Sequence, residues 1–234
     1  TVLHSTANVG IDVQQLGSEV TISRCRVQMR AGDNADRVGI HSQDAELHVD
    51  DCQVTGAALQ SVASTARAVH IEGGSPASPS SVRNSVLRGE DGSTTVPAEA
   101  YGVDVGGPVE LSNNDIEGGS ATTLAVGAYV TAGFDFSSTN DLIVGGDEGV
   151  RLVGVMSNQS ADLFFDNSTV RGRSPGETPN HAVGLVMAGQ GALSATGTSF
   201  QTGANTANDG AAVSVRGILF STEPGATDGL HLDA

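Results

Sequence analysis

The sequence predicts an all-β fold, a single right-handed parallel β-helix (solenoid) of about eight coils with three short strands per coil. Three observations lead to it. A four-residue phrase recurs about eight times, a second phrase follows most copies, and aromatic residues are only 3% with no Trp. A core with so few aromatics must be built from Val, Ile, Leu and Ala, which suit closely spaced strands.

The first phrase consists of a small residue, an apolar residue, a residue of any type and a second apolar residue. The intervals between successive copies are 29, 29, 34, 25, 27, 30 and 28 residues, so one supersecondary unit repeats along the chain. Apolar residues at every second position indicate strands. The copies begin at Gly10, Gly39, Ala68, Gly102, Gly127, Gly154, Gly184 and Ala212.

The second phrase has two apolar residues at alternate positions, a small polar residue three positions later, and a further apolar residue. One copy is Val20, Ile22, Cys25 and Val27, and the copy at Phe134 and Phe136 slips by a residue or two. We expect the polar residues to line a bend and to bond backbone groups there. This polar ladder is Cys25, Cys52, Ser85, Asn114, Thr139, Ser168 and Thr198.

Short strands of this kind cannot bury an apolar face alone, whereas stacked units can. Parallel stacking with a right-handed crossover is the strongly preferred hand. A β-sandwich and a β-propeller are the competing folds. A propeller blade needs about 40–45 residues and four strands, more than these intervals supply.

Stacking in register turns sequence columns into ladders. The column Ile11, Ile40, Val69, Val103, Ala128, Val155, Leu185, Val213 is wholly apolar and should face inward. The column Val9, Val38, Arg67, Tyr101, Val126, Val153, Val183, Ala211 should also face inward, with Arg67 as a misfit whose charge reaches out at a loop.

The phrases resemble the parallel β-helix repeats of pectate lyases, polygalacturonases and bacterial surface proteins of uncharacterised function. The resemblance covers residues 7 to about 220 and implies the fold, while function in this fold depends on individual sites. The polygalacturonase set Asn-Thr-Asp, Gly-His-Gly and Arg-Ile-Lys is absent, apart from the common dipeptide Asp50-Asp51. The Trp-containing pectate lyase signature is excluded because the chain has no Trp.

The outward column of the first strand contains Asp12, His41, His70 and Asp104. Two stacked imidazoles flanked by carboxylates could hold a divalent cation such as zinc or act as an acid–base pair, and polar drift at exposed positions is the plainer explanation. Calcium is the other candidate cation. Clusters at Asp33-Asn34-Asp36, Asp50-Asp51 and Asp147-Glu148 could bind it, but none matches an EF-hand, and solvated turns are the plainer explanation.

The small residues that open the first phrase should form a second outward column. Glycine weakens a strand, so a column that is always Gly or Ala needs a reason. A loop of the chain, another protein or a polysaccharide could lie on this strip, which comprises Gly10, Gly39, Gly102, Gly127, Gly154 and Gly184 together with Ala68 and Ala212.

The net charge of −16, with every cation an Arg, disfavours nucleic acid and anionic membranes as partners. No window approaches the roughly 18 apolar residues of a membrane span. The chain reads as one domain over residues 1–234, and its uncapped ends favour excision from a longer protein. Cys25 and Cys52 should stack as two free thiols, with a disulfide as the alternative.

These features predict a non-enzymatic, extracellular or cell-surface β-helix that serves as a scaffold, a spacer or an adhesive, glycan-contacting module. Its partner would be a polysaccharide or another protein. The alternative, from a different class, is a polysaccharide lyase or hydrolase fragment that acts on the first-strand face.

Overall fold

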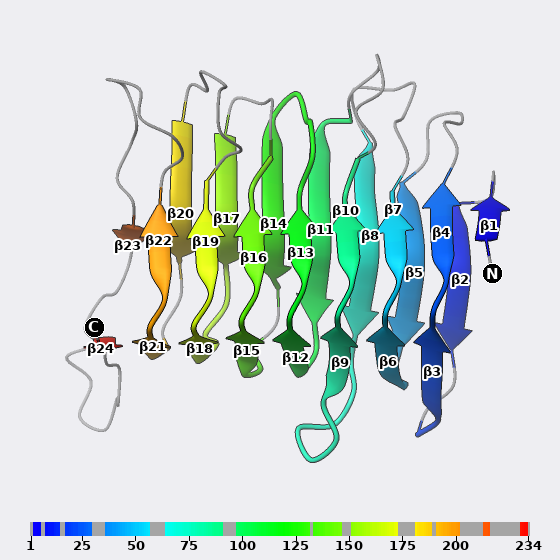
Figure 1. Ribbon diagram of the computed structural model, residues 1–234, viewed down its shortest axis with the longest axis horizontal. Coiled ribbons are helices and arrows are strands. Elements are labelled where there is room, and N and C mark those ends of the chain that lie inside the picture. The colour runs from blue at the N-terminus through cyan, green and yellow to red at the C-terminus, as the bar shows by residue number, and fades with distance from the viewer. Residues whose placement is uncertain are drawn as a thin grey trace.

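A computed structural model shows a parallel β-helix built from three parallel sheets (Figure 1). It describes residues 2–5, 8–14, 17–29, 36–56, 64–90, 97–131, 133–146, 151–172, 181–188, 191–201, 213–215 and 230–233. Each sheet holds eight strands, and the chain visits the sheets in turn. Every strand pairing is parallel, which excludes a β-sandwich or a propeller and is consistent with the right-handed crossover expected from the sequence.

Sheet A comprises β1 (Val2–Ser5), β4 (Arg26–Met29), β7 (Gln53–Thr55), β10 (Val86–Arg88), β13 (Asp115–Glu117), β16 (Leu142–Val144), β19 (Thr169–Arg171) and β22 (Ser199–Gln201). Sheet B comprises β2 (Val9–Gln14), β5 (Arg37–Gln43), β8 (Thr65–Glu72), β11 (Glu99–Gly106), β14 (Leu124–Val130), β17 (Arg151–Ser157), β20 (His181–Met187) and β23 (Val213–Val215). Sheet C comprises β3 (Glu19–Ser23), β6 (Glu46–Asp50), β9 (Ser80–Arg83), β12 (Val109–Ser112), β15 (Phe136–Thr139), β18 (Leu163–Asp166), β21 (Leu193–Thr196) and β24 (Leu230–Asp233).

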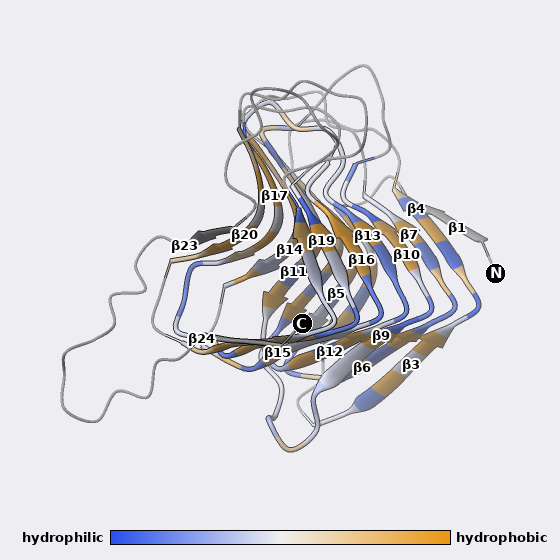
Figure 2. Cartoon of the chain, turned by 60° about the vertical axis from the view of Figure 1, so that its left-hand side comes forward, coloured by the Kyte–Doolittle hydropathy of each residue, from blue (hydrophilic) through white to orange (hydrophobic). Residues whose placement is uncertain are grey.

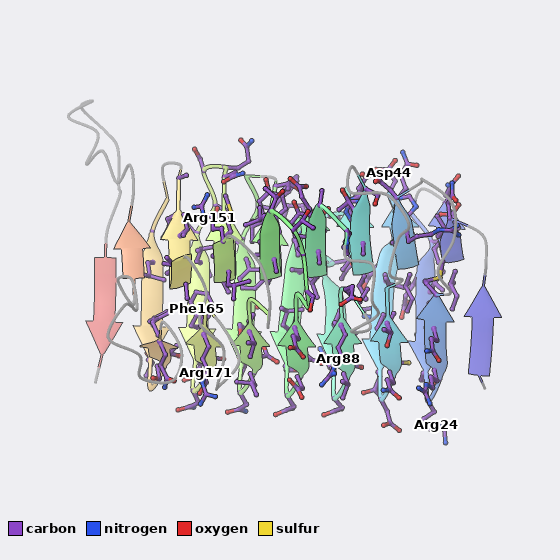
Figure 3. The ribbon with its side chains drawn as sticks, turned by 90° about the horizontal axis from the view of Figure 1, so that it is seen from above. Arg24, Asp44, Arg88, Arg151, Phe165 and Arg171 are labelled. Carbon is purple, nitrogen blue, oxygen red and sulfur yellow. The ribbon has the colours of Figure 1, made fainter. Side chains whose placement is uncertain are left out.

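The three sheets surround one apolar interior, which Figure 2 shows partly along the axis. The predicted apolar ladder is confirmed: Ile40 pairs with Ile11 on one side and Val69 on the other, and Ile40 is fully buried. Seen from above, side chains of successive strands form rows along the long axis (Figure 3). Within the described part of the chain, no helix is long and apolar enough to span a membrane.

The glycine column of sheet B faces the core, so the prediction of an outward strip is wrong. A Cβ at Gly127 would lie 2.5 Å from Cγ2 of Ile143, a core residue of sheet A, and one at Gly39 would lie 2.6 Å from Cγ1 of Val54. The two sheets converge there, so the column holds only small residues: glycine at most positions, and the fully buried Ala68 at one. Gly39, Gly102, Gly127, Gly154 and Gly184 are buried, and Gly10 is half-buried; Ala212 lies outside the described residues.

The column that begins at Val9 faces outward, which corrects a second prediction. Tyr101, Val126 and Val153 pack with Met156 and Val186 in a cluster separate from the main core. In the strands of sheet B whose side chains the structure describes, the small residue and the residue after it therefore both face inward, and strict alternation is broken. Arg67 belongs to this outer face, so its charge is not a misfit in the core.

The bend from sheet C to sheet A is stabilised by side chains of the polar ladder. The backbone N–H of Ser85 donates to Oδ1 of Asn114 at 2.9 Å, and the N–H of Asn114 donates to Oδ1 of Asp141 at 2.7 Å. Cys52 N–H donates to Oγ of Ser85 at 3.1 Å in the same way. Each such residue satisfies a backbone donor of the preceding coil, as expected from the sequence.

One member of the predicted ladder is wrong. Asp141 occupies the position assigned to Thr139, because the inner residue before it is Ser138 rather than an apolar residue. Ser138 is buried and donates to Oδ2 of Asp141 at 2.7 Å. The apparent slip in the repeat is therefore a polar substitution inside the core, and Phe136 and Ile143 keep their register.

The cysteines are free thiols, and their Sγ atoms lie 3.0 Å apart in adjacent coils. Burial, followed by the hydrogen bond with Cys52, raises the pKa of Cys25 to about 12. Because the thiolate is the reactive form, the Cys25 thiol is poorly nucleophilic at neutral pH.

Candidate functional site

The outer face of sheet B carries a cluster of charged side chains from four adjacent strands. Asp12 lies on β2, His41 on β5, His70 on β8 and Asp104 on β11, and the register places them side by side. The imidazole rings of His41 and His70 are stacked, with centroids 5.2 Å apart. We call these residues, with Glu72 and Arg67, the histidine cluster.

A carboxylate orients the first imidazole. Nδ1 of His41 lies 2.8 Å from Oδ1 of Asp12, so Asp12 accepts the Nδ1 proton and leaves Nε2 free to act as an acceptor. That Nε2 lies 3.7 Å from Oε2 of Glu72. Nε2 of His70 lies 3.2 Å from Oε1 of the same carboxylate. Glu72 therefore lies between the two rings.

Asp104 closes the other end of the cluster and is 3% exposed. Its Oδ2 accepts a hydrogen bond from Nε of Arg67 at 2.6 Å and lies 3.6 Å from Nε2 of His70. Its Oδ1 is buried and has no hydrogen-bond partner among the described residues. A buried carboxylate oxygen without a partner is costly, and such an atom in a folded protein calls for an explanation.

Burial favours the uncharged forms of both His70 and Asp104. Burial, and then the guanidinium of Arg67, lower the pKa of His70 to about 4, so this imidazole is neutral at pH 7. Burial raises the pKa of Asp104 above its ordinary value, while the adjacent Arg67 opposes that shift.

Beyond Asp104 the same face becomes aromatic and then apolar. The rings of Tyr101 and Tyr129 stack at 4.9 Å, and the guanidinium of Arg67 lies 5.6 Å from the Tyr101 centroid. Tyr101 donates a hydrogen bond to Glu99 at 2.6 Å, and Met156 and Val186 continue the column. The charged cluster is therefore confined to the N-terminal half of sheet B.

The sequence placed His41, His70, Asp12 and Asp104 together, and the structure brings all four into one cluster. It also adds Glu72, which the sequence analysis missed. The available signal was its position two residues after His70, on the same face of the strand. Of the proposed calcium clusters, Asp33, Asn34, Asp147 and Glu148 lie outside the described residues, and Oδ1 of Asp50 accepts a hydrogen bond from Asn84 at 2.8 Å.

A second candidate surface is a groove of about 400 Å³ beside sheet C. Phe164 on β18 is the lining residue furthest along the chain; it is 42% exposed and is the one exposed large hydrophobic residue in the described part of the chain. A smaller hollow of about 240 Å³ on the same face also reaches Phe164 and contains Asp166. The groove is lined by Pro76, Pro79, Pro108, Val109, Glu110, Gly133, Phe134, Asp135, Ser137 and Phe164.

Comparisons with protein-family models, with curated proteins and with solved structures found no match.

Proposed function

We propose that this chain is a non-enzymatic β-helix, extracellular or on the cell surface, that acts as a scaffold and contacts a neutral glycan through the groove beside sheet C. The observation that carries the proposal is the exposed ring of Phe164. It lies in an outer column with Glu110, Ser137 and Ser194. Ligand sites typically combine an apolar surface with a few convergent polar groups, as this column does.

The shape of the groove favours a polymer. Its lining residues come from consecutive coils, on β12, β15 and β18, so the groove crosses the strands and follows the axis of the helix. Adjacent strands are about 4.8 Å apart, so a chain of sugars lying there would contact several coils in turn.

The charge selects the type of glycan. Glu110 and Asp135 are exposed carboxylates on the groove, and the whole chain carries a net charge of −16. Like charges repel an acidic polysaccharide, whereas carboxylates accept hydrogen bonds from the hydroxyl groups of a neutral sugar.

The rival function is a polysaccharide lyase or hydrolase that acts on the first-strand face. Arg67, His70 and Asp104 favour it, because a cation, an imidazole and a buried carboxylate are groups that such enzymes use. The aromatic groove and the histidine cluster lie on different sheets, which supports binding without turnover.

Calorimetric titration with cellohexaose, xylohexaose, mannohexaose and polygalacturonate tests both functions, when combined with assays of reducing ends and unsaturated products. We expect a neutral oligosaccharide to bind. Phe164→Ala should weaken its affinity about tenfold or more, because burying a Phe ring under a ligand contributes about 1.5–3 kcal/mol to the binding free energy. Thr21→Ala, in the same outer column near the N-terminal end, should bind as the parent does. Product formation would establish the enzyme instead, and unchanged binding by Phe164→Ala would remove the groove from the site.

A further inference from the structure

We propose that His41, His70 and Glu72 bind one transition-metal ion of the zinc class (Zn²⁺, Co²⁺ or Ni²⁺) on the outer face of sheet B. The potential ligand atoms of these three residues all lie within 4.8 Å of one another. This site is separate from the glycan groove, and the proposal does not depend on glycan binding.

The distances suit a tetrahedral ion. Zinc bonds to nitrogen and oxygen of about 2.0–2.2 Å place neighbouring ligand atoms roughly 3.3–3.5 Å apart. The atom pair Nε2 of His70 and Oε1 of Glu72, at 3.2 Å, already meets this requirement, and Nε2 of His41 lies 3.7 Å from the other oxygen of Glu72. The ligand atoms of the three residues all lie within 4.8 Å of one another, so an ion would have to draw them closer by side-chain rotation.

The surroundings of His41 match those of a metal ligand. A ligating histidine usually donates its other ring N–H to a carboxylate, which fixes the tautomer and directs the lone pair at the metal. Asp12 accepts from Nδ1 of His41 at 2.8 Å, so Nε2 faces the space shared with Glu72. The sequence analysis proposed Asp12 as a ligand, whereas this geometry makes it the residue that orients a ligand.

Asp104 lies beside the proposed ligands on the outer face of sheet B. Its Oδ1 is buried without a described partner, and its Oδ2 lies 3.6 Å from Nε2 of His70. Arg67 also lies 3.7 Å from the carboxylate of Asp36, so acidic side chains outnumber the one guanidinium around the cluster. A divalent cation would offset part of this excess of negative charge.

The donor types select the metal. Two imidazole nitrogens and one carboxylate suit zinc and its neighbours, whereas calcium takes six to eight oxygen ligands. Calcium is therefore disfavoured at this cluster. Both imidazoles are 15% exposed and the Glu72 side chain is 46% exposed, so an ion can enter from solvent and a water molecule can complete the coordination.

The test is titration of the metal-free full chain with ZnCl₂ at pH 7.5, followed by calorimetry, and with CoCl₂, followed by visible absorption. We expect one ion per chain and a tetrahedral cobalt spectrum. His41→Gln, His70→Gln and Glu72→Gln each remove a proposed ligand and should each weaken binding about 100-fold or more, whereas Asp12→Asn should weaken it about 10- to 100-fold, as the loss of an orienting residue does. The matched control is His48→Gln on sheet C, whose imidazole bonds Ser81 and Glu46 and should not affect binding.

Three results would overturn the proposal: no zinc binding by the parent at 1 mM, unchanged affinity in the His41→Gln plus His70→Gln double variant, or an equal loss in His48→Gln. Circular dichroism of each variant shows whether it is folded. If the double variant does not fold, Glu72→Gln and Asp12→Asn test the site instead, because both side chains are partly exposed and their replacement should leave the fold intact. Unchanged zinc affinity in both of these variants would refute the site.

Discussion

Two polar columns run along this β-helix, and they differ in what their side chains bond. At the bend between sheets C and A, Asn114 and Asp141 accept hydrogen bonds from backbone N–H groups. On the outer face of sheet B, His41, His70 and Asp104 contact other charged side chains, and one buried oxygen has no described partner.

This difference distinguishes polar side chains that stabilise the fold from polar side chains that are available for binding. A side chain that satisfies the backbone of a neighbouring coil is part of the fold, and its loss leaves a buried donor unpaired. Ion pairs between partly exposed side chains contribute little to stability. Three substitutions test this distinction and a fourth tests the glycine column of sheet B; the four are ordered by expected cost.

The largest effect is expected from Gly127→Val, which tests the inward glycine column behind the histidine cluster. The new Cβ would lie 2.5 Å from Cγ2 of Ile143 and 2.7 Å from the carbonyl oxygen of Val144. Overpacking typically costs 1–3 kcal/mol, and contact with backbone raises the expected loss to about 3 kcal/mol or more. Urea unfolding measures it, with Thr123→Val, an exposed position just before the same strand, as control. Equal stability of both variants would mean that the column does not face the core.

Asn114→Leu should cost about 2–4 kcal/mol in the same assay. The amide of Asn114 accepts from Ser85 N–H and donates to the Val82 carbonyl at 2.8 Å, so leucine leaves buried groups unpaired. Asn114→Ser should lose less, because serine at the equivalent position of another coil, Ser85, makes the same type of bond. Equal losses for the two variants would show that shape, and not hydrogen bonding, matters at this bend.

Asp141→Asn should change how stability depends on pH. Burial raises the pKa of Asp141 to about 6, above the unfolded value of about 3.9. The stability that the folded protein gains from keeping this carboxyl protonated is therefore fully present below about pH 4 and is lost as pH rises to about 6. Relative to Asp141→Asn, the parent should lose roughly 2–3 kcal/mol between pH 4 and pH 7. The free energy of unfolding of Asp166→Asn, a change at an exposed position, should vary with pH as that of the parent does. If the stability difference between Asp141→Asn and the parent does not change with pH, the burial argument is contradicted.

The sequence predicted the fold because the repeat fixes both strand spacing and register, and Ile11, Ile40 and Val69 pair as expected. It failed at Gly127 because period-two alternation cannot reveal two consecutive inward residues. It failed at Asp141 because a buried serine replaced the apolar marker of the phrase. The histidine cluster was found in part, since columns across coils are visible in a repeat, but the bonding of Asp104 depends on side-chain conformations that spacing does not encode.

His41→Gln should have the smallest effect, less than about 1 kcal/mol in the presence of a chelator. The partner of His41, Asp12, is 42% exposed, and a polar contact between partly exposed side chains contributes about 0–1 kcal/mol. Urea unfolding in EDTA measures the cost, and a repeat with excess ZnCl₂ measures what the cluster adds when an ion is bound. Zinc should stabilise the parent and leave His41→Gln almost unchanged, because a ligand stabilises the folded state according to its affinity for it. If His41→Gln lowers the free energy of unfolding in EDTA as much as Asn114→Leu does, His41 is a structural residue and the two columns do not differ in role. If His41→Gln loses little stability in EDTA and also lacks the stabilisation that zinc gives to the parent, His41 contributes to metal binding and not to the fold.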